Sequence, residues 1–437
     1  MKEKKKLTFA IFTLGCRVNQ YESDAIGELL RGEGYSPAPR GEKADVYVIN
    51  TCAVTAESER KSRQLIRRAR AANKDSVVVV TGCCSELEGG ALLDLGADAV
   101  CGNAAKSDIP ALVGRAIADK GIKAVSIPDL LASPYDGLAV TVPKRARTYI
   151  KIEDGCSNRC AYCVIPRVRG PVRSRDADDV IREAETLLSA GVKEIILTGI
   201  ETGSYGEDLG ERCGLVPLLY RLDALGVPRI GMGSLDPSVL REDFIEAAAT
   251  LPSVLPHFHV SVQSGSSATL RRMRRKYSAD QLRDRIAALR AAVPDVTLSA
   301  DVITGFPGET DAEFDETLGA LSDLRFLHLH VFPYSARPGT EAAEMADQVP
   351  VAERKKRAAA LSRMQAEIKG DLLARYAADH ASAPVAVLVE KSERGEASGH
   401  SEHWVDVRFP GTASDVGKIL NVVTTDADGV GVMGKKA

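Results

Sequence analysis

The chain has 437 residues, a length that predicts about two to four domains, each large enough to bury its own core. It has no run of about 18 apolar residues, which argues against a membrane protein. Its 9 cysteines are too few for a disulfide-stabilised secreted scaffold, so we expect reduced, metal-binding thiols in a cytoplasmic protein. The formal net charge of -3 argues against a surface coated in positive potential.

Three short apolar segments near the N-terminus are each followed, two positions later, by a cysteine. They span residues 7–14, 46–50 and 77–81, and the helical patterns that follow them predict a parallel α/β sheet domain over residues 1–120. Ligands of such sheets bind outside the carboxyl ends of the strands, so the cysteines there are expected to converge. Three thiolates suit an iron-sulfur cube with one open iron, and the expected ligands are Cys16, Cys52 and Cys83.

The third of these positions is ambiguous, because Cys84 directly follows Cys83. We assign the ligand to Cys83, since it repeats the Gly-Cys pair of Gly15 and Cys16. Cys101 ends another short strand-like stretch and is the next substitute. Taken singly, each cysteine is also compatible with a small buried hydrophobic residue.

The remaining chain divides by pattern into three parts. Residues 121–146 have loop composition and predict a linker. From 147 to 375 apolar strands alternate with helical stretches, which predicts a partial (β/α)6 barrel rather than one of eight units. From 376 to 437 short strands between Gly and Asp turns predict a small antiparallel β-barrel. The predicted fold class is therefore α/β.

The strongest motif is a C-x3-C-x2-C run that follows the first predicted strand of this barrel. It consists of Cys156, Cys160 and Cys163, with Tyr162 before the last cysteine. Such a run gives a four-iron cube three thiolates and leaves one iron open, whereas a structural zinc site requires four ligands. The spacing resembles the radical S-adenosylmethionine superfamily, in which the open iron binds that cofactor. A closed zinc site with a distant fourth ligand is the alternative.

Four later strand ends are expected to surround S-adenosylmethionine. A glycine allows backbone to approach the methionine moiety, hydroxyl and amide side chains suit the ribose, and a Gly/Pro turn offers an apolar floor and free amides to the adenine. With the tyrosine of the cysteine loop, the expected cofactor-binding residues are Tyr162, Thr198, Gly199, Ser234, Gln263, Ile303 and Gly305.

Positive charge is concentrated in a few segments of this acidic chain. Nine basic residues lie between Lys144 and Arg175, against only Glu153 and Asp154. A phosphate-backbone partner requires such concentration, so we expect this group to contact nucleic acid. The expected RNA-binding residues of a second group are Arg271, Arg272, Arg274 and Arg275. The group from Arg354 to Arg357 is interpreted as a solvated helix face.

In this order the segments resemble the methylthiotransferase family of radical S-adenosylmethionine enzymes, over nearly the whole chain. The run Thr13 to Ser23, which contains Gly-Cys-Arg-Val-Asn, is most similar to members that methylthiolate carbon 2 of N6-threonylcarbamoyladenosine at position 37, next to the anticodon of tRNA. Members that act on N6-isopentenyladenosine, the alternative substrate, usually have Gly-Cys-Gln-Met-Asn there. Ribosomal-protein-modifying members have Gly-Cys-Pro-Lys-Asn.

The resemblance implies two 4Fe-4S clusters and S-adenosylmethionine as cofactors. The cluster of the barrel would generate a 5′-deoxyadenosyl radical that abstracts hydrogen from carbon 2, and the N-terminal cluster would carry the sulfur. The implied partners are tRNA, an electron donor such as flavodoxin or ferredoxin, and a sulfur source.

The family also implies that the C-terminal barrel is an RNA-binding TRAM domain. From residue 376 onward, however, there are six Lys and Arg against nine Asp and Glu, so we expect the arginines of the first two domains to hold tRNA. Trp404 is interpreted as a core residue of the small barrel. The competing class of function is a non-catalytic RNA-binding protein with structural metal sites.

Overall fold

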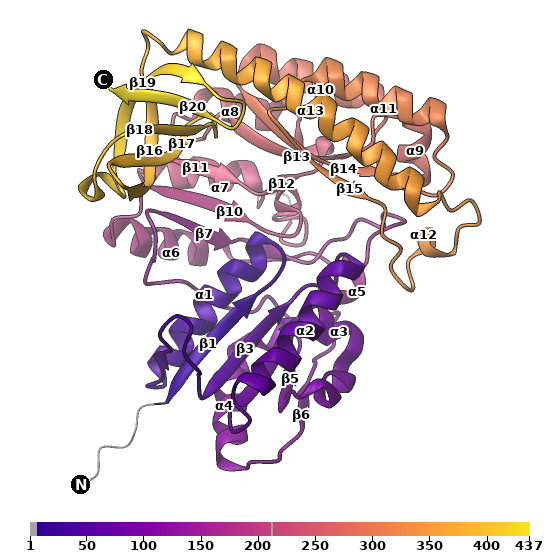
Figure 1. Ribbon diagram of the computed structural model, residues 1–437, viewed down its shortest axis with the longest axis vertical. Coiled ribbons are helices and arrows are strands. Elements are labelled where there is room, and N and C mark those ends of the chain that lie inside the picture. The colour runs from indigo at the N-terminus through magenta and orange to yellow at the C-terminus, as the bar shows by residue number, and fades with distance from the viewer. Residues whose placement is uncertain (1–6, 211–212) are drawn as a thin grey trace.

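The computed structural model describes residues 7–210 and 213–437 and confirms the α/β class (Figure 1). Its N-terminal part is a six-stranded parallel sheet of order β2-β1-β3-β4-β5-β6. The strands are β1 (Thr8–Thr13), β2 (Ser36–Pro37), β3 (Val46–Thr51), β4 (Val77–Gly82), β5 (Ala99–Cys101) and β6 (Ala124–Ser126). The helices are α1 (Arg17–Gly32), α2 (Ala56–Ala72), α3 (Cys83–Glu88) and α4 (Ile109–Ala118).

The central strands of this sheet are buried on both faces. Every residue of β3 and β4 is buried, which explains their nearly continuous apolar sequences. Their side chains alternate between two separate cores, one on each face of the sheet. Part of the expected linker also belongs here, because β6 pairs in parallel with β5 and completes the sheet edge.

The second part is the predicted parallel barrel. Its strands are β7 (Arg147–Lys151), β10 (Glu194–Thr198), β11 (Ile230–Met232), β12 (Ser234–Leu235), β13 (His257–Gln263), β14 (Thr297–Thr304) and β15 (His328–Pro333). β11 and β12 continue one another across Gly233, which leaves six strand positions in two parallel sheets. The larger helices are α6 (Ala177–Ser189), α7 (Leu215–Ala224), α8 (Glu242–Thr250), α10 (Ala279–Ala292) and α11 (Asp311–Leu324).

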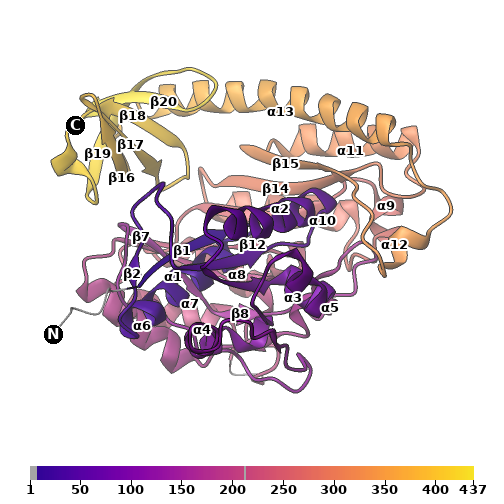
Figure 2. The same cartoon turned by 60° about the horizontal axis from the view of Figure 1, so that its bottom comes forward.

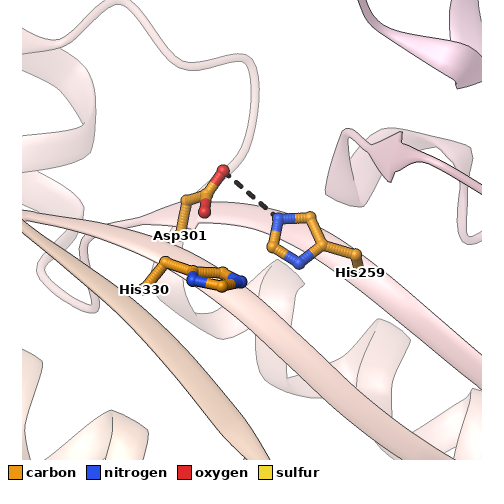
Figure 3. Close-up of side chains that lie close together, drawn as sticks. All are labelled: His259, Asp301 and His330. Atoms are coloured by element: carbon orange, nitrogen blue, oxygen red, sulfur yellow. Dashed lines mark ion pairs between the residues drawn. The ribbon is translucent and has the colours of Figure 1, made fainter. Parts of the chain in front are cut away.

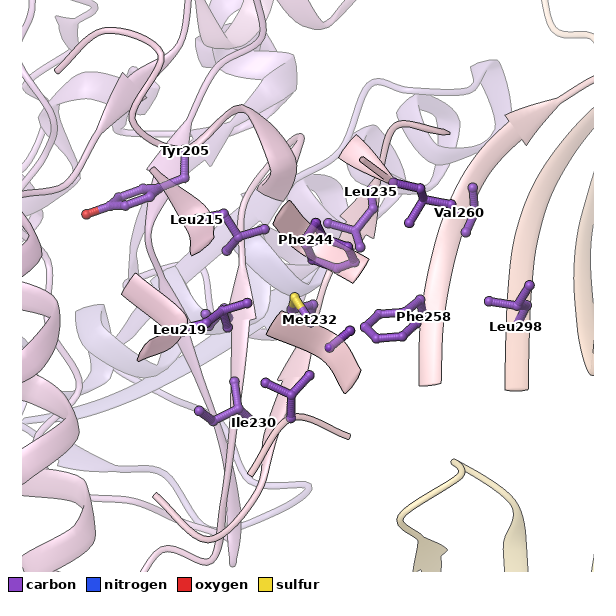
Figure 4. Packing of buried hydrophobic residues seen from close by; sticks show 14 of the residues in the cluster. Tyr205, Leu215, Leu219, Ile230, Met232, Leu235, Phe244, Phe258, Val260 and Leu298 are labelled. Carbon is purple, nitrogen blue, oxygen red and sulfur yellow. The ribbon is translucent and has the colours of Figure 1, made fainter. Parts of the chain in front are cut away.

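Successive side chains of a barrel strand point alternately outward, toward the helices, and inward, toward the barrel axis. Phe258 and Val260 of β13 join the apolar layer against the helices, where the Phe258 ring meets that of Phe244 edge-on at 5.5 Å (Figure 4). Burial of one such aromatic side chain contributes about 1.5–3 kcal/mol. His257 and His259, which alternate with these residues, face the opposite side of the strand.

The C-terminal part is a closed five-stranded barrel of order β16-β17-β18-β20-β19. Its strands are β16 (Val385–Glu393), β17 (Glu396–Ser401), β18 (Asp406–Pro410), β19 (Ile419–Ala427) and β20 (Val432–Lys436). All pairs are antiparallel except β18 with β20, which is parallel and departs from the prediction.

A long helix joins the two barrels. α13 (Val351–Asp379) has 29 residues, or about 43 Å, and reaches from the far side of the parallel barrel to the small barrel (Figure 2). It continues past the expected boundary at residue 376. No helix within residues 7–210 and 213–437 is long and apolar enough to cross a membrane.

Candidate active site

The first cysteine triplet lies at the carboxyl edge of the N-terminal sheet. Cys52 and Cys83 directly follow the neighbouring strands β3 and β4, and Cys16 comes three residues after the end of β1, on the other side of β3. Burial raises the pKa of Cys52 to about 11, and the thiols of Cys83 and Cys16 add to the rise. Cys16 is exposed, whereas Cys52 and Cys83 are buried. Because the charge of Cys83 acts on both other thiols, the three cysteines lie near one another at this edge.

Two glycines make this convergence possible. Gly15 has φ +98°, and a Cβ there would lie 2.9 Å from the Cβ of Cys52. Gly82 has φ +94°, and a Cβ would lie 2.4 Å from the carbonyl oxygen of Thr51. Both conformations favour glycine, and neither leaves room for a side chain. The Gly-Cys pairs thus reflect strand ends that approach one another closely.

The two alternative ligands have other contacts. The thiol of Cys84 donates to the carbonyl oxygen of Cys52 at 3.1 Å. The thiol of Cys101 donates to the carbonyl oxygen of Ala105 at 2.9 Å and belongs to the core on the opposite face of the sheet from Cys83. This geometry favours Cys83 as the third ligand.

The second triplet lies in the loop after β7, at the carboxyl end of the barrel. The loop is held by backbone hydrogen bonds, from Cys156 to the carbonyl of Gly170 at 3.0 Å and from Ala161 to that of Met273 at 3.1 Å. Burial raises the pKa of Cys156 and of Cys163 to about 12. Because a bound metal requires thiolates, occupation of this loop releases protons.

The thiols of each triplet are spaced more widely than the ligands of one metal ion. Tetrahedral zinc would hold thiolates about 3.8 Å apart. Among the residues that the structure describes, only His259, Asp301 and His330 bring three potential ligand atoms within 4.8 Å of one another. A four-iron cube separates its thiolates more than a single ion does, so two sets of three thiols with this wider spacing are compatible with a cube.

Residues from the loops of both triplets line one cavity of about 220 Å³, although Cys163 is the one cysteine of the six that lines it. Cys163 and Tyr162 line it from the barrel loop, and Val54 and Thr55 line it just after Cys52. The charge of Cys83 also acts on Cys163, across the boundary between the two domains. A larger cavity of about 620 Å³ is lined by neither triplet.

The expected S-adenosylmethionine residues divide into two sets. Tyr162, Gln263 and Ile303 line the cavity between the triplets. The other four, Thr198, Gly199, Ser234 and Gly305, do not line this cavity. Thr198 is buried, and Gly199 lies so close to Glu153 that a Cβ would overlap that carboxylate.

Glu201 is a site residue that the sequence interpretation missed. Its buried carboxylate accepts a hydrogen bond from the backbone of Asp236 at 2.7 Å, and its charge acts on Cys156. Burial, followed by the neighbouring Asp236, raises its pKa to about 8. A carboxylate two residues after the strand-end Gly199 was the signal available in the sequence.

Part of the basic segment around the cysteine loop is buried, which corrects the expected nucleic-acid contact. Of its nine cations, four are buried: Lys151, Arg169, Arg173 and Arg175. Arg169 donates to Glu22 at 2.6 Å and to Asp154 at 3.1 Å, and Lys151 donates to the same two carboxylates at 2.9 Å. Buried charges require such partners, so these cations join the N-terminal domain to the barrel.

The second basic group is also divided. Arg271 is exposed, Arg272 pairs with Glu313, and Arg274 pairs with Glu341 at the surface. The side chain of Arg275 is only 5% exposed and donates to the Sγ of Cys160 at 3.3 Å and to Asp236 at 2.6 Å. The expected RNA contact of Arg275 is therefore wrong, because its guanidinium is committed to the cysteine loop.

The interpretation of Arg354 to Arg357 as a solvated face is wrong in part. Arg357 is buried and donates to Glu309 at 2.8 Å. Arg354 packs over Gly305, where a Cβ would lie 2.4 Å from its Cγ. Both side chains support the turn after β14, next to the cavity.

Trp404 is not a core residue of the small barrel, contrary to the interpretation above. Its ring stacks on that of His257 at 5.4 Å, between the two barrels. Nearby, the Nε2 of His259 lies 3.2 Å from Asp301, and His330 points toward both from the next strand (Figure 3). Polar and aromatic groups therefore line the interior beyond the cavity.

Comparisons with known proteins agree with this geometry. The radical SAM superfamily matches residues 150–321, and the uncharacterized protein family UPF0004 matches residues 8–102. The threonylcarbamoyladenosine tRNA methylthiotransferase MtaB of Bacillus subtilis is 39% identical over 95% of this chain and 93% of its own. The tRNA-2-methylthio-N(6)-dimethylallyladenosine synthase of Syntrophomonas wolfei is 33% identical over 99% and 98%.

A solved structure supports the fold. The radical S-adenosylmethionine methyltransferase TsrM of Kitasatospora setae aligns with a TM-score of 0.58 at 15% identity, over 90% of this chain and 81% of its own. Near-complete coverage of relatives above 30% identity establishes the wider grouping. The chain belongs to the radical S-adenosylmethionine tRNA methylthiotransferase family.

Proposed function

We propose that this enzyme methylthiolates carbon 2 of N6-threonylcarbamoyladenosine next to the anticodon of tRNA. The observation that carries the proposal is a pair of three-thiol sets whose loops line one cavity, with Cys83 of the first set close enough for its charge to act on Cys163 of the second. Replacement of an unactivated C–H bond by a C–S bond requires a radical source and a sulfur source within reach of the same carbon. The relative at 39% identity, named for threonylcarbamoyladenosine, supports this choice of nucleoside.

The cofactors are 4Fe-4S clusters and S-adenosylmethionine. Cys156, Cys160 and Cys163 would hold the radical cluster, and Cys16, Cys52 and Cys83 would hold the auxiliary cluster. When bound, these groups supply reductive cleavage of S-adenosylmethionine and a sulfur atom for transfer.

The protein's own residues position the reactants and stabilise charge. Asp236 orients Arg275, whose guanidinium donates to Cys160 and stabilises negative charge on that sulfur. Tyr162, Gln263 and Ile303 line the space for S-adenosylmethionine. Glu201 offers a buried carboxylate beside Cys156 for the amino group of that cofactor.

The reaction requires partners beyond tRNA. An electron donor such as flavodoxin or ferredoxin and a separate sulfur source complete the proposal, in a cytoplasmic setting. N6-isopentenyladenosine is the second candidate substrate, because dimethylallyladenosine synthases are 33% and 34% identical over 99% and 97% of this chain.

The test is mass spectrometry of nucleosides from tRNA incubated anaerobically with reconstituted protein, reductant and S-adenosylmethionine. We expect a methylthio product only from tRNA that carries threonylcarbamoyladenosine. Product from isopentenyladenosine alone would support the second candidate. Tightly bound zinc without S-adenosylmethionine cleavage would refute the enzymatic proposal.

A further inference from the structure

Arg17 is a cation without a counter-charge in direct contact. It is the first residue of α1 and directly follows Cys16. In the described part of the chain, its half-buried guanidinium has no hydrogen bond or ion pair. It makes a cation–π contact with the ring of Trp404, whose centroid is 5.6 Å away. Arg147 lies over the same ring at 4.6 Å but is paired with Glu194 at 3.7 Å and with Glu390. Arg17 thus differs from the neighbouring arginine.

The groups around Arg17 already have partners. Asp301 lies close enough for its charge to act on Arg17, but this carboxylate is engaged with His259 at 3.2 Å. The Nδ1 of His257 is hydrogen-bonded to Thr297 at 2.8 Å. A half-buried guanidinium with five N–H donors and no acceptor is suited to an anionic ligand.

The local backbone also favours an anion. α1 has 16 residues and no acidic side chain in its first turn, so no carboxylate of the helix itself competes for an anion at its positive N-terminal end. Asp301 lines the cavity between the cysteine loops, and its charge acts on Arg17, so the guanidinium lies near this cavity without lining it.

The two nucleosides named in the relatives differ in charge. The threonylcarbamoyl group ends in a carboxylate, whereas the dimethylallyl group is an uncharged hydrocarbon. Only N1 separates C2 from C6 in adenine, so a base that presents C2 to the cavity places its N6 substituent along the adjacent edge. We propose that Arg17 binds the threonyl carboxylate and thereby selects this nucleoside. The inference rests on the proposed function and deepens it.

The test removes the charge from each partner in turn. Anticodon stem-loops carrying threonylcarbamoyladenosine, or its methyl ester, are assayed anaerobically with the reconstituted wild-type protein and with Arg17→Gln. For wild type, we expect esterification to lower kcat/KM about 10- to 100-fold, the range for one charge-assisted hydrogen bond, mainly through KM. For Arg17→Gln, acid and ester should react equally, and Arg17→Lys should restore part of the preference.

The control is Arg31→Gln, the same change in the last turn of the same helix. It should keep the wild-type preference. Iron content and S-adenosylmethionine cleavage without RNA should be unchanged in Arg17→Gln. Because the ester comparison also uses wild-type protein, it can overturn the proposal even if the variant folds poorly.

Three outcomes separate the possible failures. Equal reaction of acid and ester with wild type overturns the assignment of Arg17 while leaving the proposed function intact. If Arg17→Gln keeps the wild-type preference for the acid, the assignment is also overturned. It is likewise overturned if Arg17→Gln loses affinity equally for the acid and the ester stem-loop, because that result indicates a phosphate contact. Absence of product from the acid stem-loop with cluster-loaded wild type refutes the proposed function itself.

Discussion

At the scale of single residues, buried charge surrounds the first cysteine triplet. Lys106, Lys151 and Arg169 share two buried carboxylates, Glu22 and Asp154. Although burial opposes it, Arg169 and the two lysines hold the pKa of Glu22 well below its usual range and that of Asp154 at about 2, so both carboxylates are ionised at neutral pH. Three cations against two anions leave positive charge beside Cys16 and Cys83. Arg169 is the member that acts on both thiols.

We predict that Arg169→Ala destabilises the protein by about 3 to 5 kcal/mol, because it removes the cation that both buried carboxylates share and leaves their charge only partly compensated. It should also weaken iron binding by the first triplet. Denaturant unfolding and iron content measure the two effects. Arg167→Ala removes an exposed arginine of the same short helix, α5 (Ile165–Arg169), and should change both by little. Similar losses in the two variants would contradict this role.

The adjacent cysteines provide a second prediction at this scale. Cys83→Ser should lose about half of the iron, one of two four-iron cubes, and all methylthio product. Cys84→Ser should retain both, because its thiol contacts the carbonyl of Cys52. Iron analysis of matched reconstitutions distinguishes the two variants. The reverse pattern would move the ligand by one residue.

At the scale of elements, the short helix α9 (Ser267–Arg272) and the turn after it have two kinds of arginine. Arg271 and Arg274 are exposed, whereas Arg275 supports Cys160. The same basic run therefore supplies exposed arginines to the surface and one buried arginine to the cysteine loop.

We predict that Arg271→Ala with Arg274→Ala lowers the slope of log affinity for tRNA against log salt by up to about 2, since each duplex phosphate contact contributes about 0.9. S-adenosylmethionine cleavage without tRNA should be unchanged. Arg275→Ala should instead reduce that cleavage. The matched control, Lys391→Ala with Arg394→Ala, removes two exposed cations of the small barrel and should change the slope less. A larger change in the control would place the main RNA surface there.

At the scale of the whole molecule, an ion network joins the small barrel to the parallel barrel. Arg147 of β7 pairs with Glu390 of β16. His400 of β17 lies 2.7 Å from Glu390 and 3.0 Å from Asp406. Although burial opposes protonation, these carboxylates raise the pKa of His400 to about 9.

This shift predicts a pH-dependent contribution to stability. A histidine with a raised folded pKa stabilises fully below its unfolded pKa of about 6.5 and loses that contribution as pH rises through about 9. The loss is on the order of 2 to 3 kcal/mol. Unfolding followed by the fluorescence of Trp404, the only tryptophan, should show it between these pH values. His400→Gln should flatten this dependence, and an unchanged pH profile would contradict the assignment.

The sequence alone determined the features encoded by local spacing. Short apolar runs that alternate with helical patterns predicted the two parallel sheet domains and the small barrel after them, and the C-x3-C-x2-C run identified the cysteine loop. Cysteines after three successive strands predicted convergence at one sheet edge, and the structure adds that Gly15 and Gly82 have the positive φ angles that these close approaches require.

Only the tertiary structure decided which charges face solvent. Glu22 pairs with Lys106, 84 positions away, and with Arg169, 147 positions away. No local pattern distinguishes such a cation from an exposed one, so Arg169 and Arg275 resembled RNA contacts in sequence. The contacts of Trp404 with His257 and Arg17 likewise join three separate parts of the chain. Burial and pairing depend on packing between distant segments, and that packing sets the roles of these residues.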